Sequence, residues 1–239
     1  FNIPDDSYYL SFDLAVLKSD QTPTGTPPVY APDDRIAVLI GDGYNWSTAN
    51  IVREWNNTGS PYVYNDIRIS GEKVVIPLTG HSGHCRFAFY AGSTEYNADN
   101  DVMFNNMEVA AFSNLPLAAQ NPIPENNAQD VPLNAKLFWD AGGNAPVSYN
   151  LYLGQTLPGT PVECLSPHYT PAALAYGTTY SWKVVPVNPI GEAIDCPVWN
   201  FTTTGTATVG AGTVTINDVP INPSVEISGL EGETVISAS

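Results

Sequence analysis

Basic residues are scarce in this chain of 239 residues, which contains 8 lysines and arginines against 24 aspartates and glutamates. The formal net charge is therefore −16 at neutral pH. Nucleic acids and anionic membrane surfaces are both bound through clustered cations. We therefore expect neither as a partner, and the strongly acidic surface suits a location outside the cell or on its surface.

Long apolar runs are also missing. No stretch of 18 apolar residues occurs, so no segment is expected to insert into a membrane as a helix. The nearest candidate for an amphipathic helix is STANIVREW (47–55), but its β-branched residues and Trp55 argue against it. Cysteine is rare, with 3 residues and no CxxC pair, which excludes a zinc ribbon and a thioredoxin-like motif.

Alternation of apolar and polar residues is the dominant pattern. Leu10, Phe12 and Leu14 alternate with Ser11 and Asp13, and similar segments recur between clusters of Gly, Pro, Asn and Asp. This pattern is typical of antiparallel strands with one buried face, so we predict an all-β fold. The predicted strands are 8–17, 35–41, 62–70, 73–78, 84–91, 102–112, 134–140, 148–154, 179–187 and 197–204.

Residues 114–132 interrupt this pattern with four prolines and several asparagines, which is typical of a stiff, polar connector. We place a domain boundary near residue 120 and predict two β-sandwiches in series. The expected organisation is a first domain at 1–113, the connector at 114–132, a second domain at 121–204 that the connector overlaps, and a β-prone tail or start of a further module at 205–239.

Residues 121–204 resemble a fibronectin type III-like domain of secreted, multi-domain bacterial surface proteins. The resemblance rests on NPIPENNAQDVPLNAKLFWDAGG, SYNLYLG, LAYGTTYSWKVVPVNPIGE and VWNFTTTG, in that order. Leu174, followed six residues later by Tyr180, matches the tyrosine corner of immunoglobulin-like sandwiches. We therefore expect such a sandwich, with Trp139, Tyr180 and Trp182 in one core.

Residues 1–113 resemble a jelly-roll domain of the choice-of-anchor J and cleaved-adhesin type. The resemblance rests on YYLSFDLAV, DDRIAVLIGDGYNWS, IVREWNN, VVIPLTGHSGHCRFAFYAGS and NADNDVMFNNMEV. It implies that the opening strands of the jelly roll are missing, which would leave an uncovered apolar face at Leu10, Phe12 and Phe87. Because open strand edges recruit other strands, we hypothesise that segments of the tail fill the gap, within the chain or in a neighbouring copy.

Two of the cysteines, Cys164 and Cys196, are candidates for a disulfide. In a fibronectin-like order, both lie near the same end of one sheet. Two intervening strands would still separate them unless the loop NPIGEAID (188–195) folds across. The sequence leaves the bridged and the free forms open.

Two groups of residues are candidate metal ligands. His81, His84 and Cys85 offer two imidazoles and a thiolate for zinc or copper, but the set lacks a fourth ligand, and a turn that enters a strand is the favoured interpretation. We expect no cofactor, with structural calcium as the alternative, because carboxylates are the ligands that calcium prefers. The acidic candidates for calcium are Asp33, Asp34, Glu95, Asp99 and Asp101.

Five aromatic residues are crowded into a short segment of the first domain. Rings of this kind, with Asn and Asp nearby, bind sugars in lectin-like jelly rolls. Core packing is the competing interpretation, and the favoured one, since Trp and Tyr are usually at least partly buried. The candidate ligand-binding residues are Tyr44, Trp46, Trp55, Tyr62 and Tyr64.

No HExxH, GxSxG or P-loop motif occurs, so the sequence favours a protein without catalytic activity. The two resemblances imply a surface or adhesion module of a large secreted bacterial protein, with a glycan or another surface protein as partner. A carbohydrate-binding module is the first alternative. The second is a subunit of an extracellular fibre that assembles by β-strand addition.

Overall fold

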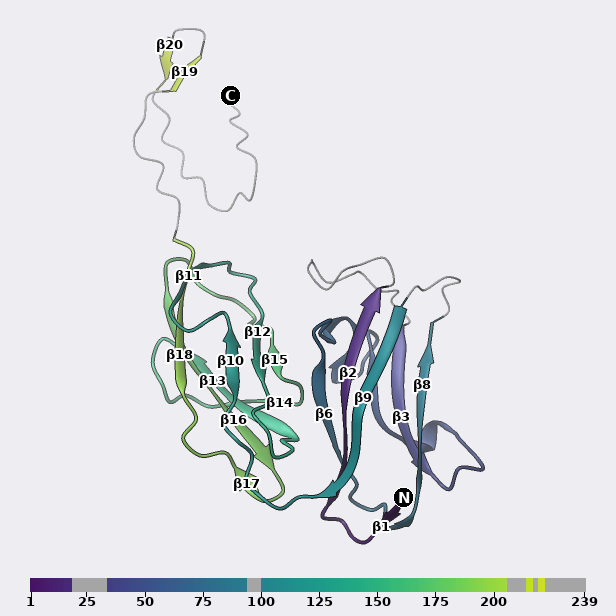
Figure 1. Cartoon of the computed structure of the whole chain (residues 1–239). Helices are drawn as coiled ribbons and strands as arrows, with labels where there is room; N and C mark the ends of the chain where they lie inside the picture. Colours follow the sequence, from purple (N-terminus) through teal and green to yellow (C-terminus); the bar gives the residue numbers. More distant parts are fainter. Residues whose placement is uncertain (19–33, 94–99, 206–213, 217–218, 222–239) are drawn as a thin grey trace.

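The computed structural model describes residues 1–18, 34–93, 100–205, 214–216 and 219–221. These residues form two β-sandwiches that lie side by side (Figure 1). The predicted all-β class is thus confirmed. Among the described residues, no helix is long and apolar enough to cross a membrane.

The first sandwich pairs a sheet of order β6-β2-β9 with a sheet of order β5-β4-β3-β8, and β1 pairs with β7 beside them. Two short 3-10 helices, η1 (Thr48–Asn50) and η2 (Tyr64–Asp66), flank β4 and β5. The strands are β1 (Asn2–Ile3), β2 (Tyr8–Lys18), β3 (Arg35–Gly41), β4 (Ile51–Asn56), β5 (Tyr62–Val63), β6 (Glu72–Pro77), β7 (Gly83–His84), β8 (Arg86–Gly92) and β9 (Asn100–Ala111).

The apolar face of β2 is covered. Leu10 and Phe12 are fully buried between the two sheets, and Phe87 is partly buried against the same core. The prediction that these residues line an uncovered face is therefore wrong. The physical reason is that β3, β4 and β8 supply an opposing sheet, with Phe89 packed edge-on against Phe12 at 5.3 Å between ring centroids.

The second sandwich pairs a sheet of order β10-β12-β15 with a sheet of order β11-β18-β16-β13-β14, and β17 pairs with β16. This two-layer arrangement is immunoglobulin-like, as predicted. The strands are β10 (Gln120–Ile123), β11 (Ala128–Val131), β12 (Leu137–Asp140), β13 (Ser148–Gly154), β14 (Val162–Cys164), β15 (His168–Tyr169), β16 (Thr179–Asn188), β17 (Gly191–Glu192) and β18 (Val198–Thr203).

Large aromatic side chains fill the core of the second sandwich, as the sequence predicts. Trp139 and Trp182 are fully buried, with ring centroids 6.3 Å apart, and Tyr180 packs against the same core. The Ala175 amide donates a hydrogen bond of 2.9 Å to the Tyr180 hydroxyl, close to the buried Leu174. The tyrosine corner is therefore present.

The predicted connector is mostly part of the second sandwich, because β10 and β11 lie within residues 114–132. In the tail, β19 (Val214–Ile216) and β20 (Val219–Ile221) pair with each other. Most of residues 205–239 lie outside the described residues, as does the hypothesis that the tail donates a strand.

Ion pairs and hydrogen bonds join the two sandwiches. Lys136 lies 2.6 Å from the Asp66 carboxylate, and Arg68 lies 3.3 Å from Asp140. The Arg68 guanidinium also donates to the backbone carbonyl of Trp139 at 3.2 Å. Because Trp139 sits in the second core, this bond fixes one sandwich against the backbone of the other.

The candidate disulfide between Cys164 and Cys196 is not formed, and both residues are free thiols in the structure. Cys164 lies on β14 at one edge of its sheet, whereas Cys196 precedes β18, with β16 and β13 in between. Three steps of about 4.8 Å per strand far exceed the roughly 7 Å between Cα atoms that a disulfide allows. The loop at 188–195 instead forms β17 against β16.

We expect titration of the unfolded, unreduced protein to find three thiols per chain. In the folded protein, Cys164 should react more slowly than Cys196 at neutral pH, because burial raises the pKa of the Cys164 thiol to about 11 and the thiolate is the reactive form. A single thiol per unfolded chain would show instead that the two cysteines are bridged.

Candidate functional site

The structure divides the five predicted aromatic residues into two groups. Trp55 and Tyr64 are almost completely buried in the core of the first sandwich, where they are 1% and 3% exposed. Tyr62 packs against Trp55 at 5.7 Å between ring centroids, and the Arg53 guanidinium covers its ring at 4.2 Å. These three residues therefore stabilise the fold and do not join Tyr44 and Trp46 in one site.

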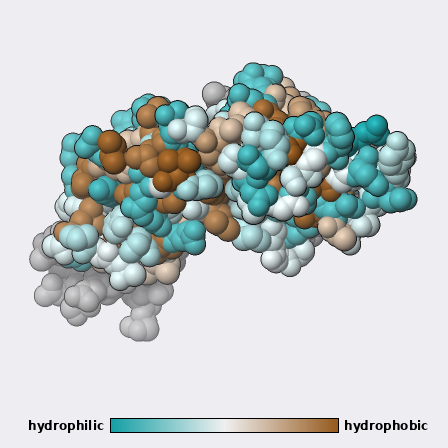
Figure 2. Space-filling model, turned by 90° about the horizontal axis from the view of Figure 1, so that it is seen from below, coloured by the Kyte–Doolittle hydropathy of each residue, from teal (hydrophilic) through white to brown (hydrophobic). Residues whose placement is uncertain are grey.

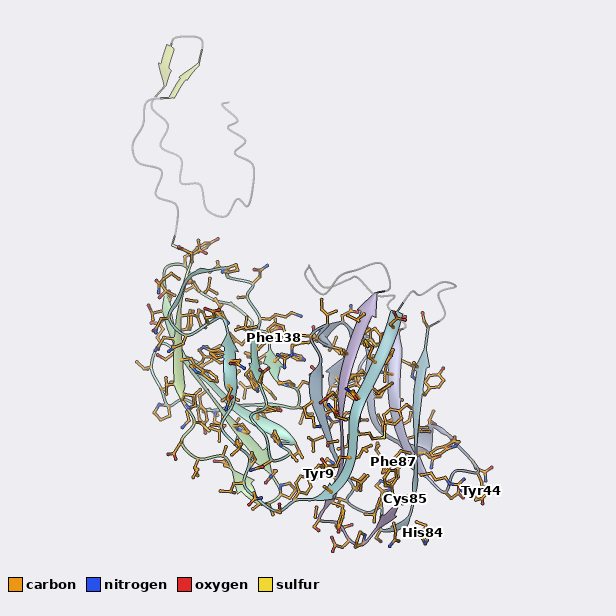
Figure 3. The ribbon with its side chains drawn as sticks, viewed as in Figure 1. Tyr9, Tyr44, His84, Cys85, Phe87 and Phe138 are labelled. Carbon is orange, nitrogen blue, oxygen red and sulfur yellow. The ribbon has the colours of Figure 1, made fainter. Side chains whose placement is uncertain are left out.

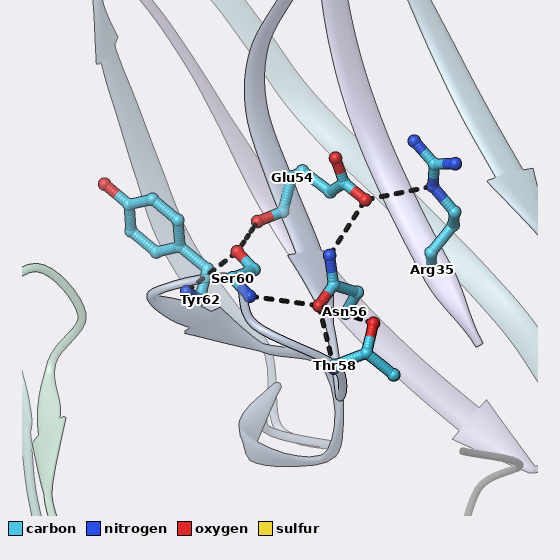
Figure 4. Close-up of polar contacts among 6 residues, drawn as sticks. All are labelled: Arg35, Glu54, Asn56, Thr58, Ser60 and Tyr62. Carbon is cyan, nitrogen blue, oxygen red and sulfur yellow. Dashed lines mark hydrogen bonds and ion pairs between the residues drawn. The ribbon is translucent and has the colours of Figure 1, made fainter. Parts of the chain in front are cut away.

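A polar network sets the position of Tyr62 (Figure 4). The Asn56 carboxamide oxygen accepts hydrogen bonds from the backbone amides of Thr58 and Ser60, at 2.9 and 3.1 Å. The Ser60 hydroxyl donates to the Glu54 carbonyl and accepts a bond of 3.1 Å from the Tyr62 amide. The chain therefore turns sharply after β4, and β5 runs parallel beside it.

Tyr44 and Trp46 lie on the loop that follows β3. Tyr44 is 79% exposed and Trp46 is 39% exposed. Figure 3 shows Tyr44 at the far side of the first sandwich, directed away from the second. Exposed aromatic side chains on an ordered loop are a common means of binding a ligand.

Several contacts fix the conformation of this loop. The Asp42 carboxylate accepts a bond of 2.9 Å from the Tyr44 amide. Gly43 has a positive φ of 87°, and a Cβ atom there would lie 2.3 Å from the Arg86 side chain. Arg86 in turn lies over the Tyr44 ring, 5.5 Å from its centroid. The Trp46 ring lies against Gly41, where a Cβ atom would approach it to 3.3 Å.

This arrangement presents one open aromatic face with polar groups beside it. A sugar ring stacks its C–H face on such a side chain, while the Asn45 and Ser47 side chains next to it in the chain can bond hydroxyls. Arg86 is a residue that the sequence analysis missed. In the sequence, Gly43 is the feature that could have indicated this contact, because only a residue without Cβ leaves room for the Arg86 side chain.

The structure favours a structural role for His81, His84 and Cys85. The Cys85 thiol donates to the His81 carbonyl at 3.4 Å and packs against the first core, while His84 is exposed on β7. In the described part of the chain, no group of three or more His, Cys, Asp or Glu side chains is arranged to hold a metal ion. Residues 83–84 of this segment form β7, and β8 begins at Arg86.

The acidic residues predicted for calcium are only partly described. Asp34 is buried, with 1% of its surface exposed, and Asp101 is exposed on β9. Asp33, Glu95 and Asp99 lie outside the described residues. A calcium site that includes them stays a prediction.

A groove of about 430 Å³ lies between the two sandwiches. The outer face of the β6-β2-β9 sheet forms its floor, and the loop between β12 and β13 forms its wall. Tyr9 is labelled in Figure 3 next to the second sandwich. The lining residues with polar side chains are Tyr9, Ser11, Lys73, Glu108 and Asn144. None of these residues is a candidate site residue from the sequence alone.

Charged side chains are buried next to this groove. Glu72 is 7% exposed and interacts with Arg53, Arg68 and Asp66 from the first sandwich and with Tyr149 from the second. Burial raises the pKa of Glu72 to about 7, against the opposing effect of the two guanidiniums. Burial likewise raises the pKa of the Tyr149 phenol and lowers that of Arg53. A cavity of about 10 Å³ beside Glu72 is close to the size of one water molecule.

The lower end of the second sandwich carries apolar surface. Figure 2 views the molecule from below and shows apolar side chains gathered on this domain, at the end where β17 lies in Figure 1. Ile190 and Ile194, which flank β17, are 51% and 69% exposed.

Comparison with known proteins gives only distant similarities. No protein-family model and no curated protein sequence matches the chain. Among solved structures, a β-1,2-glucanase from Parabacteroides distasonis is similar over 85% of this chain, with 18% identity and a TM-score of 0.28. The chain spans 28% of that glucanase. A tripod from the baseplate of bacteriophage Tuc2009 is similar over 85% of this chain and 71% of its own length, with 16% identity and a TM-score of 0.20.

Proposed function

We propose that this chain is a non-catalytic module of an extracellular surface protein and that it binds a glycan through Tyr44 and Trp46. The observation that carries the proposal is the ordered loop after β3, which exposes 79% of Tyr44. The resemblance to adhesin-type jelly rolls and fibronectin type III-like domains agrees with this role.

Physical chemistry favours a glycan as the ligand. An exposed aromatic ring loses little conformational entropy on binding, because the loop is already fixed by Arg86 and Asp42. Stacking buries the apolar face of the ring, and the adjacent polar side chains bond hydroxyls. The net charge of −16 favours a neutral glycan, since it repels polyanions.

The strongly shifted pKa values lie away from the proposed glycan site. The groups whose pKa values are shifted most, Glu72 and Tyr149, are packed between the sandwiches and not in the exposed loop. Perturbed groups of this kind also occur in structural charge clusters. We therefore assign them to the contact between the domains.

Replacement of Tyr44 and Trp46 by alanine should abolish glycan binding with little change in stability. The measurement is a glycan array with the wild-type chain, followed by affinity electrophoresis of Tyr44→Ala and Trp46→Ala in the glycan that binds. We expect each variant to lose about tenfold or more in affinity, as expected for a lost stacking contact of about 1.5 kcal/mol.

The matched control is Tyr176→Ala, because Tyr176 is a tyrosine that is 44% exposed on the second sandwich. It should bind as the wild type does. Equal retardation of Tyr44→Ala and wild type, or an equal loss in the Tyr176→Ala control, would contradict the assignment of the loop.

A further inference from the structure

We propose that the groove between the two sandwiches is a second ligand site, which takes a neutral saccharide chain. It shares no residue with the loop of Tyr44 and Trp46. The two places lie on different sheets of the first sandwich, because Tyr44 follows β3 whereas the groove lies on β6-β2-β9. The inference therefore stands or falls independently of the proposed function.

The floor of the groove is a shielded sheet face. Leu10 and Phe12 on β2 point into the core. Because side chains alternate along a strand, Tyr9 and Ser11 point outward. Ser11 is only 1% exposed, so it forms the base of the groove and leaves contact with a bound molecule to the more exposed residues around it.

The strand register places charged side chains of both signs near Ser11. Val75 on β6 and Glu108 on β9 lie opposite Ser11 on its two sides. Lys73 lies two residues before Val75 on the same face of β6, and its ammonium nitrogen is 3.6 Å from the Asp13 carboxylate. The floor therefore presents an exposed ammonium group and an exposed carboxylate around a buried base.

Tyr9 supplies an aromatic surface beside these groups. Its ring packs against Phe112 at 4.8 Å between ring centroids, which fixes its orientation. Burial and, to a lesser degree, the Glu108 carboxylate raise the pKa of the Tyr9 phenol. Its hydroxyl therefore remains a hydrogen-bond donor at neutral pH.

The wall is a loop with an unusual backbone. Gly142, Gly143, Asn144 and Ala145 all have positive φ, at 79°, 141°, 56° and 54°. Positive φ costs a residue with a side chain on the order of 1–3 kcal/mol, and such residues gather at ligand-binding sites. At Gly142 a Cβ atom would lie 2.3 Å from the Ala118 carbonyl oxygen, so this position requires glycine.

Hydrogen bonds hold the wall in this conformation. The Asn144 carboxamide donates to the Leu115 carbonyl at 2.9 Å. The Asn188 carboxamide donates to the carbonyls of Asn144 and Asn114, at 3.0 and 2.9 Å. With the ion pairs between the sandwiches, these bonds make a groove that is formed before a ligand binds, which lowers the entropic cost of binding.

The chemistry of the lining favours a neutral saccharide. The hydroxyl groups of a sugar both donate and accept hydrogen bonds, so they can bond Lys73 and Glu108 together. The half-buried Tyr9 ring suits the C–H face of a sugar ring, whereas Val75 and Pro146 are buried beneath the groove. An anionic sugar would meet Glu108 and the negative charge of the whole chain. The volume lies within the range of about 300–1,000 Å³ that is usual for ligand sites.

The test is an NMR titration of the whole chain with neutral six-unit oligosaccharides of glucose (β-1,3 and β-1,4), mannose and xylose. At least one should shift the backbone amides of Ser11, Glu108 and Gly143. Glu108→Gln and Tyr9→Ala should each weaken this binding about tenfold or more, whereas Glu125→Gln, at an exposed glutamate of the second sandwich, should not. Tyr9→Phe keeps the contact with Phe112 and serves as the milder variant if Tyr9→Ala does not fold.

Three outcomes would overturn the proposal. The first is that no member of the panel shifts these three amides. The second is that polygalacturonate or an extended peptide shifts them and the neutral sugars do not, which would assign the groove to another class of ligand. The third is that Tyr44→Ala removes the shifts, which would place binding at the loop alone and leave the proposed function intact.

Discussion

Replacement of Trp139 by alanine should cost about 3–5 kcal/mol of unfolding free energy, the usual range for a large buried aromatic residue. Trp139 is fully buried and packs against Trp182 and Tyr149, at 6.3 and 5.4 Å between ring centroids. Its removal would leave a cavity between the two sheets that the neighbouring rings cannot fill without moving. Urea unfolding of the whole chain, followed by tryptophan fluorescence and far-UV circular dichroism, measures the loss.

Two further variants make this measurement decisive. Ile194→Ala removes an apolar side chain that is 69% exposed and should change stability by no more than about 0.5 kcal/mol. Trp139→Phe retains an aromatic ring and should lose less than Trp139→Ala, which keeps the comparison possible if the alanine variant does not fold. A loss below about 1 kcal/mol in Trp139→Ala would contradict its role at the centre of this core.

The second sandwich was predictable because its signals are local. Alternation of apolar and polar residues along 179–187 identifies the buried face of β16. The six-residue spacing from Leu174 to Tyr180 locates the tyrosine corner, whose hydrogen bond joins residues only five positions apart. The Pro and Asn residues around position 120 mark the boundary. None of these signals depends on how the two domains meet.

Prediction was less accurate where local pattern and burial diverge. The segment 62–70 alternates like a strand, but within it only Tyr62–Val63 forms a strand, and the chain then turns through η2. This turn buries Tyr64 and Ile67 in the core. The density of aromatic residues along the sequence therefore could not distinguish these core residues from the exposed Tyr44.

The groove and the buried charges were not predictable from the sequence, because they arise from contacts between distant segments. Arg68 meets the Trp139 carbonyl across 71 positions, and Lys136 meets Asp66 across 70. Tyr9 and Glu108 appear in the sequence as ordinary outward residues of strands. Only the docking of the second sandwich on that face gives them a shared environment.

Glu72 should make the chain less stable as the pH rises from about 4.5 to about 7. Burial at the contact between the sandwiches raises its pKa in the folded state to about 7, from an ordinary value of about 4.5. The folded state therefore binds more protons than the unfolded state in this window, and stability falls as pH increases. The stabilisation that the protonated Glu72 carboxyl provides is complete below the pKa of Glu72 in the unfolded chain. It is lost as the pH rises through the pKa of Glu72 in the folded chain.

Glu72→Gln should remove this dependence, because the carboxamide resembles the protonated acid and carries no charge to desolvate. At pH 8 the variant should be more stable than the wild type by on the order of 3 kcal/mol, which corresponds to the raised pKa. At pH 4.5 the two proteins should be about equally stable. Thermal unfolding of both proteins between pH 4.5 and 8 provides the measurement.

Other titrating groups at this contact call for a matched control. Burial lowers the pKa of His168, which lies near Asp66, Lys136 and Arg68. His168 therefore contributes the opposite trend, a loss of stability as the pH falls below the unfolded value of about 6.5. Glu163→Gln removes one exposed carboxylate and should follow the wild type at every pH, which accounts for the change in net charge. If Glu72→Gln were less stable than wild type at pH 8, the attraction of Arg53 and Arg68 for the carboxylate would outweigh the cost of its burial, and the ionised form would be the one that joins the two sandwiches.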